Sequence, residues 1–338
     1  MTKNTFQTFK RSLLALAVGS LALAALPGTA SAQNYKSEYR MSLVLGPAFP
    51  WGKGGEIWAN KVRERTQGRI NIKLYPGVSL IQGDQTREFS ALRQGVIDMA
   101  VGSTINWSPQ VKQLNLFSLP FLMPDYAAVD SLTQGEVGKN LFKVLDQAGV
   151  VPLAWGENGY REISTSKLPI KKPEDLKGLK IRVTENPVHI TAFRTLGASP
   201  TPMAWPEVIG ALQQGTIDGQ ENPISVFVSA KLWQVQKHLT LTSHVYAPMA
   251  LIVSPGFWGS LNDAQKAAFT QGAKAGALAS RKFVDEVEKK GVEEIKSHGV
   301  QVVTQVDRAA FQAALAPAYK QYASKFGQKT LDEISHAK

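Results

Sequence analysis

The sequence predicts an α/β protein of two lobes, with mixed, mostly parallel sheets and a long helix near the C-terminus. Strand-like stretches alternate with helix-like stretches, and glycines stand where helices should end, which is typical of α/β sheets. The second observation is an internal echo, because Ala-Leu-Arg-Gln-Gly-Val-Ile-Asp (91–98) resembles Ala-Leu-Gln-Gln-Gly-Thr-Ile-Asp (211–218). Two similar lobes, each with its own sheet, would produce this echo; coincidence between two ordinary helix–glycine–strand junctions is the alternative.

The individual elements follow from hydrophobic periodicity. Ile57, Trp58 and Val62 recur at helical spacing, whereas apolar and polar residues alternate over 70–74 as in a strand. The same reasoning predicts the bounds of the other strands and helices in the first two thirds of the chain. Strands are expected at 41–45, 70–74, 97–101 and 179–183, and helices at 54–67 and 84–94.

The last third of the chain changes to a long, lysine-rich helical pattern over 262–298. Asn262 is a suitable N-cap and Gly299 a suitable stop, since glycine accepts a left-handed backbone at low cost. A short strand at 300–303 and helices at 308–323 and from 329 onward complete the chain. We expect these helices to brace both lobes from outside.

Residues 1–32 have the pattern of a cleavable signal peptide. A positively charged start is followed by an apolar run over 12–26, and Ala30-Ser31-Ala32 fits cleavage after Ala32. A membrane anchor is the alternative, but the run is shorter than the roughly 20 apolar residues that a spanning helix needs. We therefore expect an exported protein of a bacterial periplasm.

Composition excludes several classes of protein. The sequence contains no cysteine, so disulfides, a lipid anchor on cysteine and a thiol nucleophile are all excluded. The net charge of +11 includes three positive residues of the predicted signal peptide. The other basic residues are scattered and often stand beside acids, which disfavours nucleic acid as a partner. A modest positive charge favours an anionic solute.

Motifs of the common enzyme classes are missing. There is no Gly-x-Ser-x-Gly, no His-Glu-x-x-His and no phosphate loop, and the five histidines lack metal-ligand spacing. Gly52-Lys53-Gly54-Gly55 is a weak anion-binding pattern, with a flexible turn as the alternative. We expect no catalytic residue, no metal and no cofactor. The remaining enzyme hypothesis would use Glu157 or Glu221 as a general acid or base.

Side chains suited to holding a small anion gather between residues 158 and 223. Arg182 lies on the polar face of an expected strand, where its planar guanidinium could hold a carboxylate by two parallel hydrogen bonds. Arg161 is similarly placed, Asn222 offers a donor and an acceptor, and Trp205 could lie flat on a solute. A solvated arginine and a core tryptophan are the alternatives.

Several motifs in this region occur together in one known family. They are Asn-Gly-Tyr-Arg (158–161), Leu-Lys-Gly-Leu-Lys-Ile-Arg-Val (176–183), Gly-Ala-Ser-Pro-Thr-Pro-Met-Ala-Trp-Pro-Glu-Val (197–208), Asp-Gly-Gln-Glu-Asn-Pro (218–223) and Gln-Val-Gln-Lys (234–237). With them the chain resembles, over nearly its whole mature length, the solute-binding subunits of tripartite ATP-independent periplasmic (TRAP) transporters, the DctP family.

The resemblance implies a periplasmic binding protein fold with hinge strands. It implies lobes at 33–157 and 158–253 and bracing helices at 254–338. It also implies that Arg182 pairs with the carboxylate of an organic acid, and that Arg161 and Asn222 belong to the same site. The family usually has phenylalanine where Trp205 stands, so we expect a pocket of different shape here.

The resemblance implies partners as well. The loaded, closed protein, expected as a monomer, would dock on the small and large integral membrane subunits, which move the solute with a sodium gradient. Closure would expel water around the arginine–carboxylate pair. The lower dielectric would strengthen the attraction between the two charges but would also raise the cost of removing them from water. A ligand-sensing module that docks on a receptor is the alternative.

The solute is predicted to be a sugar acid, such as a hexuronate, rather than a C4-dicarboxylate. Aromatic faces suit the apolar side of a sugar ring, and the first lobe is rich in tryptophan. Four further residues are expected to reach hydroxyl groups. They are Gln85, Glu88, Ser103 and His244.

Overall fold

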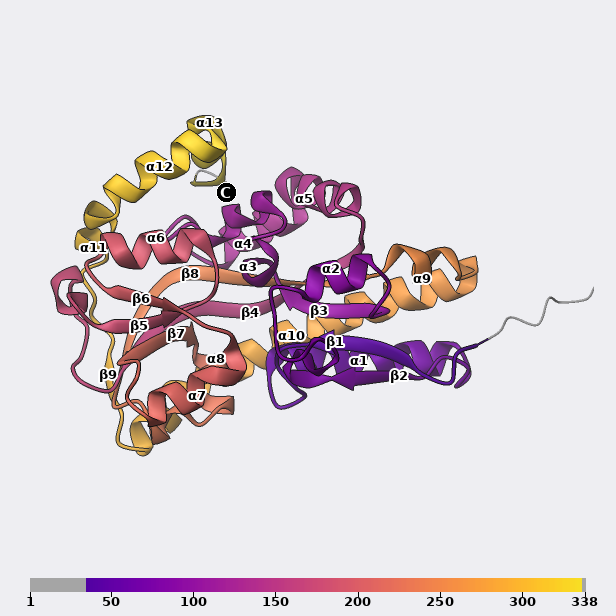
Figure 1. The fold of residues 1–338 in the computed structure, drawn as a ribbon, viewed down its shortest axis with the longest axis horizontal. Helices are drawn as coiled ribbons and strands as arrows, with labels where there is room; N and C mark the ends of the chain where they lie inside the picture. Colours follow the sequence, from indigo (N-terminus) through magenta and orange to yellow (C-terminus); the bar gives the residue numbers. More distant parts are fainter. Residues whose placement is uncertain (1–34, 336–338) are drawn as a thin grey trace, which may run out of the picture. The chain divides into compact units, whose positions relative to one another are not determined.

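The computed structural model describes residues 35–335 (Figure 1). The predicted signal peptide, residues 1–32 with cleavage after Ala32, lies outside the described residues. Among the helices that are described, none combines the length and the apolar character needed to cross a bilayer.

The described strands form one mixed sheet in the order β2-β1-β3-β8-β4-β7-β5-β6, with β9 paired to β8. Their bounds are β1 (Tyr39–Leu43), β2 (Ile72–Tyr75), β3 (Met99–Ser103), β4 (Val151–Thr165), β5 (Lys180–Val183), β6 (Ser199–Pro202), β7 (Gly219–Pro223), β8 (His238–Val253) and β9 (Gln301–Val303). β1 is parallel to β2 and β3, and β5 is parallel to β6 and β7. The α/β class and the mixed sheet are therefore confirmed.

The two parallel groups are joined by the long antiparallel pair β4 and β8. The sheet is continuous, unlike the separate sheets expected for two lobes, because β8 pairs with β3 of one group and β4 pairs with β7 of the other. The β4–β8 register shifts between Glu157 and Gly159 and again between Arg161 and Ile163. Figure 1 shows both strands crossing between the two groups.

Helices cover this sheet. They are α1 (Pro50–Arg65), α2 (Glu88–Arg93), α3 (Thr104–Trp107), α4 (Tyr126–Gln134), α5 (Glu136–Gln147), α6 (Pro187–Thr195), α7 (Trp205–Gln213), α8 (Ile224–Ser229), α9 (Pro255–Gly259), α10 (Asp263–Ser297), α11 (Arg308–Ala314), α12 (Ala316–Phe326) and α13 (Gln328–Ser335). Short 3-10 helices lie at Pro76–Ile81, Lys112–Ser118, Pro173–Leu176 and Leu232–Gln234.

The predicted long helix is present as α10, which has 35 residues. Asn262 and Gln265 form a capping box that satisfies the first N–H groups, and Gly299 follows the helix with φ +81°. The helix packs against α1, β4 and α8 and thus contacts elements from both halves of the chain.

The two copies of the echo play the same structural part. Each ends a helix, turns at a glycine and enters a strand, β3 or β7. Asp98 Oδ2 accepts the backbone N–H of Arg40 at 2.8 Å, and Asp218 Oδ2 accepts that of Lys180 at 2.8 Å. Each aspartate thereby fixes the start of the neighbouring parallel strand, so the echo reflects structure rather than coincidence.

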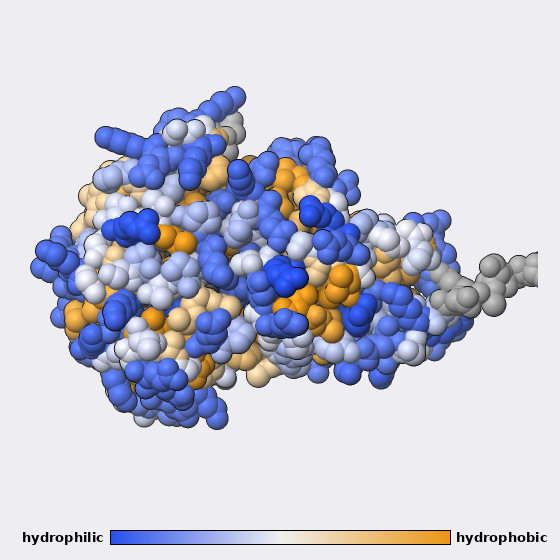
Figure 2. Space-filling view, viewed as in Figure 1, coloured by the Kyte–Doolittle hydropathy of each residue, from blue (hydrophilic) through white to orange (hydrophobic). Residues whose placement is uncertain are grey.

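Apolar side chains fill the space between the helices and the sheet. One cluster joins β5 and α6 to α11 and α12, and another lies between α7, α8 and α10. The face of the molecule in Figure 2 is mostly hydrophilic, with small separate hydrophobic patches. The core must provide the stability, because no disulfide is possible.

Candidate functional site

A small pocket lies where the parallel strands end. Ser103 ends β3, Arg182 lies on β5 and Asn222 lies on β7, which is the edge where α/β sheets commonly bind ligands. The pocket holds about 30 Å³ and is lined by Val44, Leu45, Trp51, Gln85, Ser103, Asn106, Asn158, Arg161, Arg182, Thr184, Trp205 and Asn222.

Most of the residues expected from the sequence meet at this pocket. Those that line it are Arg161, Arg182, Asn222, Trp205, Gln85 and Ser103; Glu88 and His244 do not. Sequence reasoning did not assign Val44, Leu45, Asn106 or Thr184 to the site. Asn158 belongs to the motif Asn-Gly-Tyr-Arg, and Trp51 to the tryptophans of the expected first lobe, but neither was predicted individually to line the site.

Arg182 is a buried cation without an ion-pair partner among residues 35–335. It is 2% exposed, and its Nε and Nη2 donate to the carbonyl oxygen of Met203 at 3.0 and 2.6 Å. Its guanidinium lies 5.9 Å from the ring centroid of Trp205. Burial lowers the pKa of Arg182 to about 10, so the side chain is charged at neutral pH.

Arg161, in contrast, is already paired. Its Nε donates to Glu221 Oε2, and its Nη2 donates to Glu221 Oε1 at 2.8 Å and to the Glu221 carbonyl at 2.6 Å. Both side chains are buried. Burial acts to raise the pKa of Glu221, but Arg161 together with His189 and His244 outweighs it, and the pKa lies well below 4.5.

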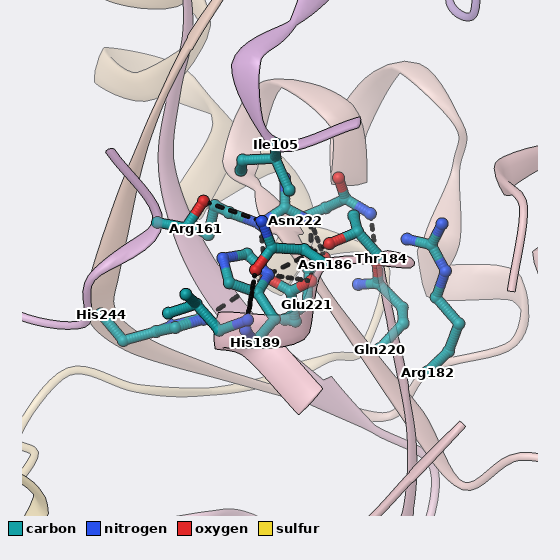
Figure 3. A network of polar contacts seen from close by, with 12 residues as sticks. Ile105, Arg161, Arg182, Thr184, Asn186, His189, Gln220, Glu221, Asn222 and His244 are labelled. Carbon is teal, nitrogen blue, oxygen red and sulfur yellow. Dashed lines mark hydrogen bonds and ion pairs between the residues drawn. The ribbon is translucent and has the colours of Figure 1, made fainter. Parts of the chain in front are cut away.

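Two histidines stand against the same carboxylate (Figure 3). His189 Nδ1 lies 3.7 Å and His244 Nε2 lies 3.4 Å from the oxygens of Glu221. Burial lowers the pKa of both histidines below 6.5, although Glu221 opposes this. His244, expected to reach hydroxyl groups of a solute, instead belongs to this network behind the pocket. Figure 3 shows Arg182 apart from it.

Glu88 also differs from the expectation. It is fully buried and accepts hydrogen bonds from Ser42 Oγ at 2.7 Å and Trp107 Nε1 at 3.0 Å. Burial raises the pKa of Glu88 to about 7, against the effect of these two hydrogen bonds. Its contacts with Ser42 and Trp107 place it in the core beside β1 and α3, and it does not line the pocket.

Three polar atoms in the pocket wall have no hydrogen-bond partner. They are Trp51 Nε1, Gln85 Nε2 and Asn158 Oδ1. Buried polar groups are nearly always paired, so two donors and one acceptor here are available to a bound molecule. The other end of Gln85 is engaged, because Oε1 accepts the backbone N–H of Trp205 at 3.2 Å.

The side-chain amide of Asn222 is held by a chain of buried groups. Asn222 Nδ2 donates to Gln220 Oε1 at 2.6 Å, and Gln220 Nε2 donates to Ser164 Oγ at 2.8 Å. Ser164 in turn donates to Gln236 at 2.9 Å. Such a chain fixes the orientation of the amide before any ligand arrives.

Among the described residues that line the pocket, the charged side chains are two arginines, and none is a carboxylate. Glu221 is held by Arg161, and Glu157 lies on the other side of the bulged strand, where its oxygens approach Arg281 at 3.5 Å. The described residues contain no group of three or more potential metal ligands.

Comparison with known proteins agrees with this chemistry. Residues 41–325 match the DctP family, described as "Bacterial extracellular solute-binding protein, family 7". A curated relative, the 2,3-diketo-L-gulonate-binding periplasmic protein YiaO of Escherichia coli, is 35% identical over 92% of this chain and 90% of its own.

Two solved structures are similar throughout. A TRAP periplasmic solute-binding protein of Ralstonia eutropha with bound (S)-2-acetolactate is 54% identical, with a TM-score of 0.85 over 90% of this chain and 99% of that one. One of Polaromonas sp. bound to D-erythronate is 38% identical, with a TM-score of 0.86 over 90% and 99%. The family consists of binding proteins rather than enzymes. The chain therefore belongs to the DctP family, the solute-binding proteins of TRAP transporters.

Proposed function

We propose that this protein captures an organic acid in the periplasm, with Arg182 as its carboxylate contact, and delivers it to the membrane subunits of a TRAP transporter. The observation that carries the proposal is the burial of an arginine without an acidic partner among residues 35–335. An uncompensated buried charge costs several kcal/mol. The carboxylate of a solute would remove that cost and use the planar fork of the guanidinium.

The solute is proposed to be a hydroxy or oxo acid of the sugar-acid type. The two free donors, Trp51 Nε1 and Gln85 Nε2, suit hydroxyl or carbonyl oxygens, and Asn158 Oδ1 suits a hydroxyl proton. Diketogulonate, acetolactate and erythronate, named for the relatives, each combine one carboxylate with such groups. Hexuronates share this pattern, whereas C4-dicarboxylates have a second carboxylate instead.

The remaining expectations from the sequence are part of the proposal. Residues 33–157 and 158–253 would form two lobes, and 254–338 would brace them, with β4 crossing the boundary. The solute would be enclosed between the lobes, and the protein would act as a monomer after loss of residues 1–32. The pocket is lined by residues of both 33–157 and 158–253, which supports this arrangement.

The test is calorimetric titration of the purified protein with D-erythronate and D-glucuronate. Arg182→Ala should abolish binding, and Arg182→Lys should weaken it by about tenfold or more, because each hydrogen bond to a charged group contributes roughly 1.5–3 kcal/mol. Arg194→Lys, on the exposed side of α6, is the matched control and should bind as the wild type does. Unchanged affinity in Arg182→Lys would contradict the two-pronged contact.

A further inference from the structure

Asn106, in the short helix α3, brings an unbonded amide to the pocket wall. Its side chain is 7% exposed, and among residues 35–335 it forms no hydrogen bond. The amide of Asn222 differs, because its nitrogen already donates to Gln220 at 2.6 Å. Buried polar groups are nearly always paired, so the two donors and the acceptor of Asn106 are available to a bound molecule.

The pairing capacity of this amide favours one kind of chemical group. A carboxylate can only accept hydrogen bonds, so it would leave Oδ1 of Asn106 without a partner. A hydroxyl group can donate to Oδ1 or accept from Nδ2, and two neighbouring hydroxyl groups can do both at once. An acid with adjacent hydroxyl groups would therefore satisfy Asn106 while its carboxylate meets Arg182.

The helix that carries Asn106 is held at both ends by buried serines. Ser103 Oγ accepts the backbone N–H of Ile105 at 3.1 Å. Ser108 Oγ donates to the carbonyl oxygen of Ile105 at 2.8 Å. Since Ile105 directly precedes Asn106, the position of Ser108 helps to set where the Asn106 amide lies.

Asn186 holds Ser108 in turn. It is fully buried, and its Nδ2 donates to Ser108 Oγ at 2.6 Å, to Asn115 Oδ1 at 3.0 Å and to Ser118 Oγ at 3.0 Å. Its Oδ1 accepts two backbone N–H groups at 2.9 Å each and so caps the start of α6. Asn186 follows β5, the strand of Arg182, so one amide connects the strand of the arginine with the end of α3.

We propose that Asn106 is a specificity-determining residue that binds hydroxyl groups of a polyhydroxy acid, and that Asn186 is a positioning residue that holds Asn106 in place through Ser108. The inference rests on the proposed function, in that Arg182 is taken to hold the carboxylate. Buried hydrogen bonds would fix Asn106 relative to Arg182 before the solute arrives, which lowers the ordering cost of binding. If Asn186 only capped α6, its loss would reduce stability without changing the affinity of the folded protein.

The experiment is calorimetric titration of the purified protein with D-erythronate and D-glucuronate, and the acid that the wild type binds more tightly becomes the probe. Its unsubstituted counterpart, butanoate or hexanoate, has the same number of carbons and no hydroxyl group. The wild type should bind the probe about tenfold or more tightly than that counterpart, and Asn106→Ala should weaken binding of the probe about five- to thirtyfold, the loss expected for one or two hydrogen bonds. The exposed Asn140→Ala, on α5, is the matched control and should bind as the wild type does.

A double-mutant cycle tests the positioning role. Serine is also a good N-cap, but its shorter side chain removes the contacts of Nδ2. Asn186→Ser should therefore weaken probe binding about fivefold or more, and should cause no further loss once Asn106 is alanine, because the two residues act through one contact. Asn262→Ser makes the same change at the N-cap of α10, away from the pocket, and should leave the affinity unchanged.

A further variant covers the case in which Asn186→Ser fails to fold, as judged by circular dichroism. Ser118→Ala removes one of the three acceptors of Asn186 and should give a smaller loss of affinity with the same dependence on Asn106.

The inference and the proposed function fail in different ways. A folded Asn106→Ala with wild-type affinity, a wild type that binds the probe and its counterpart equally, or losses at the two sites that add in full would overturn the inference and leave the proposed function standing. Failure of the wild type to bind either D-erythronate or D-glucuronate would contradict the proposed function itself and the inference with it.

Discussion

At the scale of single residues, Glu162 is a buried acid that no arginine or lysine of the described chain pairs with. Its Oε2 accepts the backbone N–H of Ser243 at 2.7 Å and its Oε1 accepts Ser243 Oγ–H at 3.0 Å. Burial raises the pKa of Glu162 to about 8, although the hydrogen bonds from Ser243 oppose the rise. The folded protein therefore holds a proton here at neutral pH that the unfolded chain has released.

This predicts that the free energy of unfolding falls as the pH rises from about 4.5 to about 8. The stabilisation is complete below the pKa of the unfolded chain and is lost as the pH passes the folded pKa, with a slope of at most about 1.4 kcal/mol per pH unit for one proton. Glu162→Gln should make the slope shallower by that amount. Urea unfolding between pH 7 and pH 8 is the cleanest window, since Glu88 and Glu157, with pKa values of about 7, contribute mainly below it.

The exposed Glu286→Gln is the control and should leave the slope unchanged, since its side chain is 63% exposed. An equal slope in the wild type and in Glu162→Gln would refute the assignment of the proton to this carboxyl.

The sequence predicted most of the pocket at this scale, because its motifs contain residues that line the pocket. It did not separate the two arginines. Arg161 and Arg182 looked alike as candidates, yet the pairing of Arg161 with Glu221 spans 60 residues and depends on β4 lying beside β7. Glu88 and His244 do not line the pocket, because their partners Ser42, Trp107 and Glu221 come from other elements and only the tertiary structure brings them together.

At the scale of elements, α1 and α10 approach each other through glycines. A Cβ added at Gly276 would lie 2.5 Å from the carbonyl oxygen of Gly54, and one added at Gly272 would lie 2.8 Å from the Trp58 ring. The cluster Gly52-Lys53-Gly54-Gly55, in which the sequence suggested either a flexible turn or an anion site, therefore lies inside α1 and allows close packing.

Gly276→Ala should destabilise the protein by about 1–3 kcal/mol, the usual cost of overpacking. Gly210 in α7 is the matched control, because nothing lies within 4 Å of a Cβ added there. Gly210→Ala should stabilise the protein by up to about 1 kcal/mol, since alanine is the better helix former. Thermal unfolding of the two variants measures the difference, and equal effects would refute the packing explanation.

The order of the elements was predictable from periodicity, and α10 began and ended close to the expected caps. The continuous sheet was not predictable. Strands at 151–165 and 238–253 join the two parallel groups by antiparallel pairing between segments far apart in the chain. Local alternation of apolar residues cannot show such pairing, because it depends on register between strands.

At the scale of the whole molecule, one hydrogen bond links the two parts of the pocket wall. Gln85, before α2, accepts the N–H of Trp205 at the start of α7, 120 residues further on, and the Gln85 side chain also lines the pocket. A single amide thus contacts both the protein backbone and, under the proposed function, the solute.

Gln85→Ala should speed the release of D-erythronate about five- to thirtyfold, because it removes one or two hydrogen bonds of roughly 1 kcal/mol each. Stopped-flow tryptophan fluorescence suits the measurement, since Trp51 and Trp205 line the pocket. The exposed Gln94→Ala is the control. Release at the wild-type rate in Gln85→Ala would show that this amide does not hold the pocket closed.

The register shifts of β4 have a mechanical consequence. Asn158 stands within the shift between Glu157 and Gly159, and Arg161 borders the shift between Arg161 and Ile163. A pair of β-strands bends most easily where its backbone hydrogen bonds are interrupted. A change of curvature at these two shifts would displace Asn158 and Arg161, so under the proposed function bending of the sheet and contact with the solute would depend on the same short stretch of backbone.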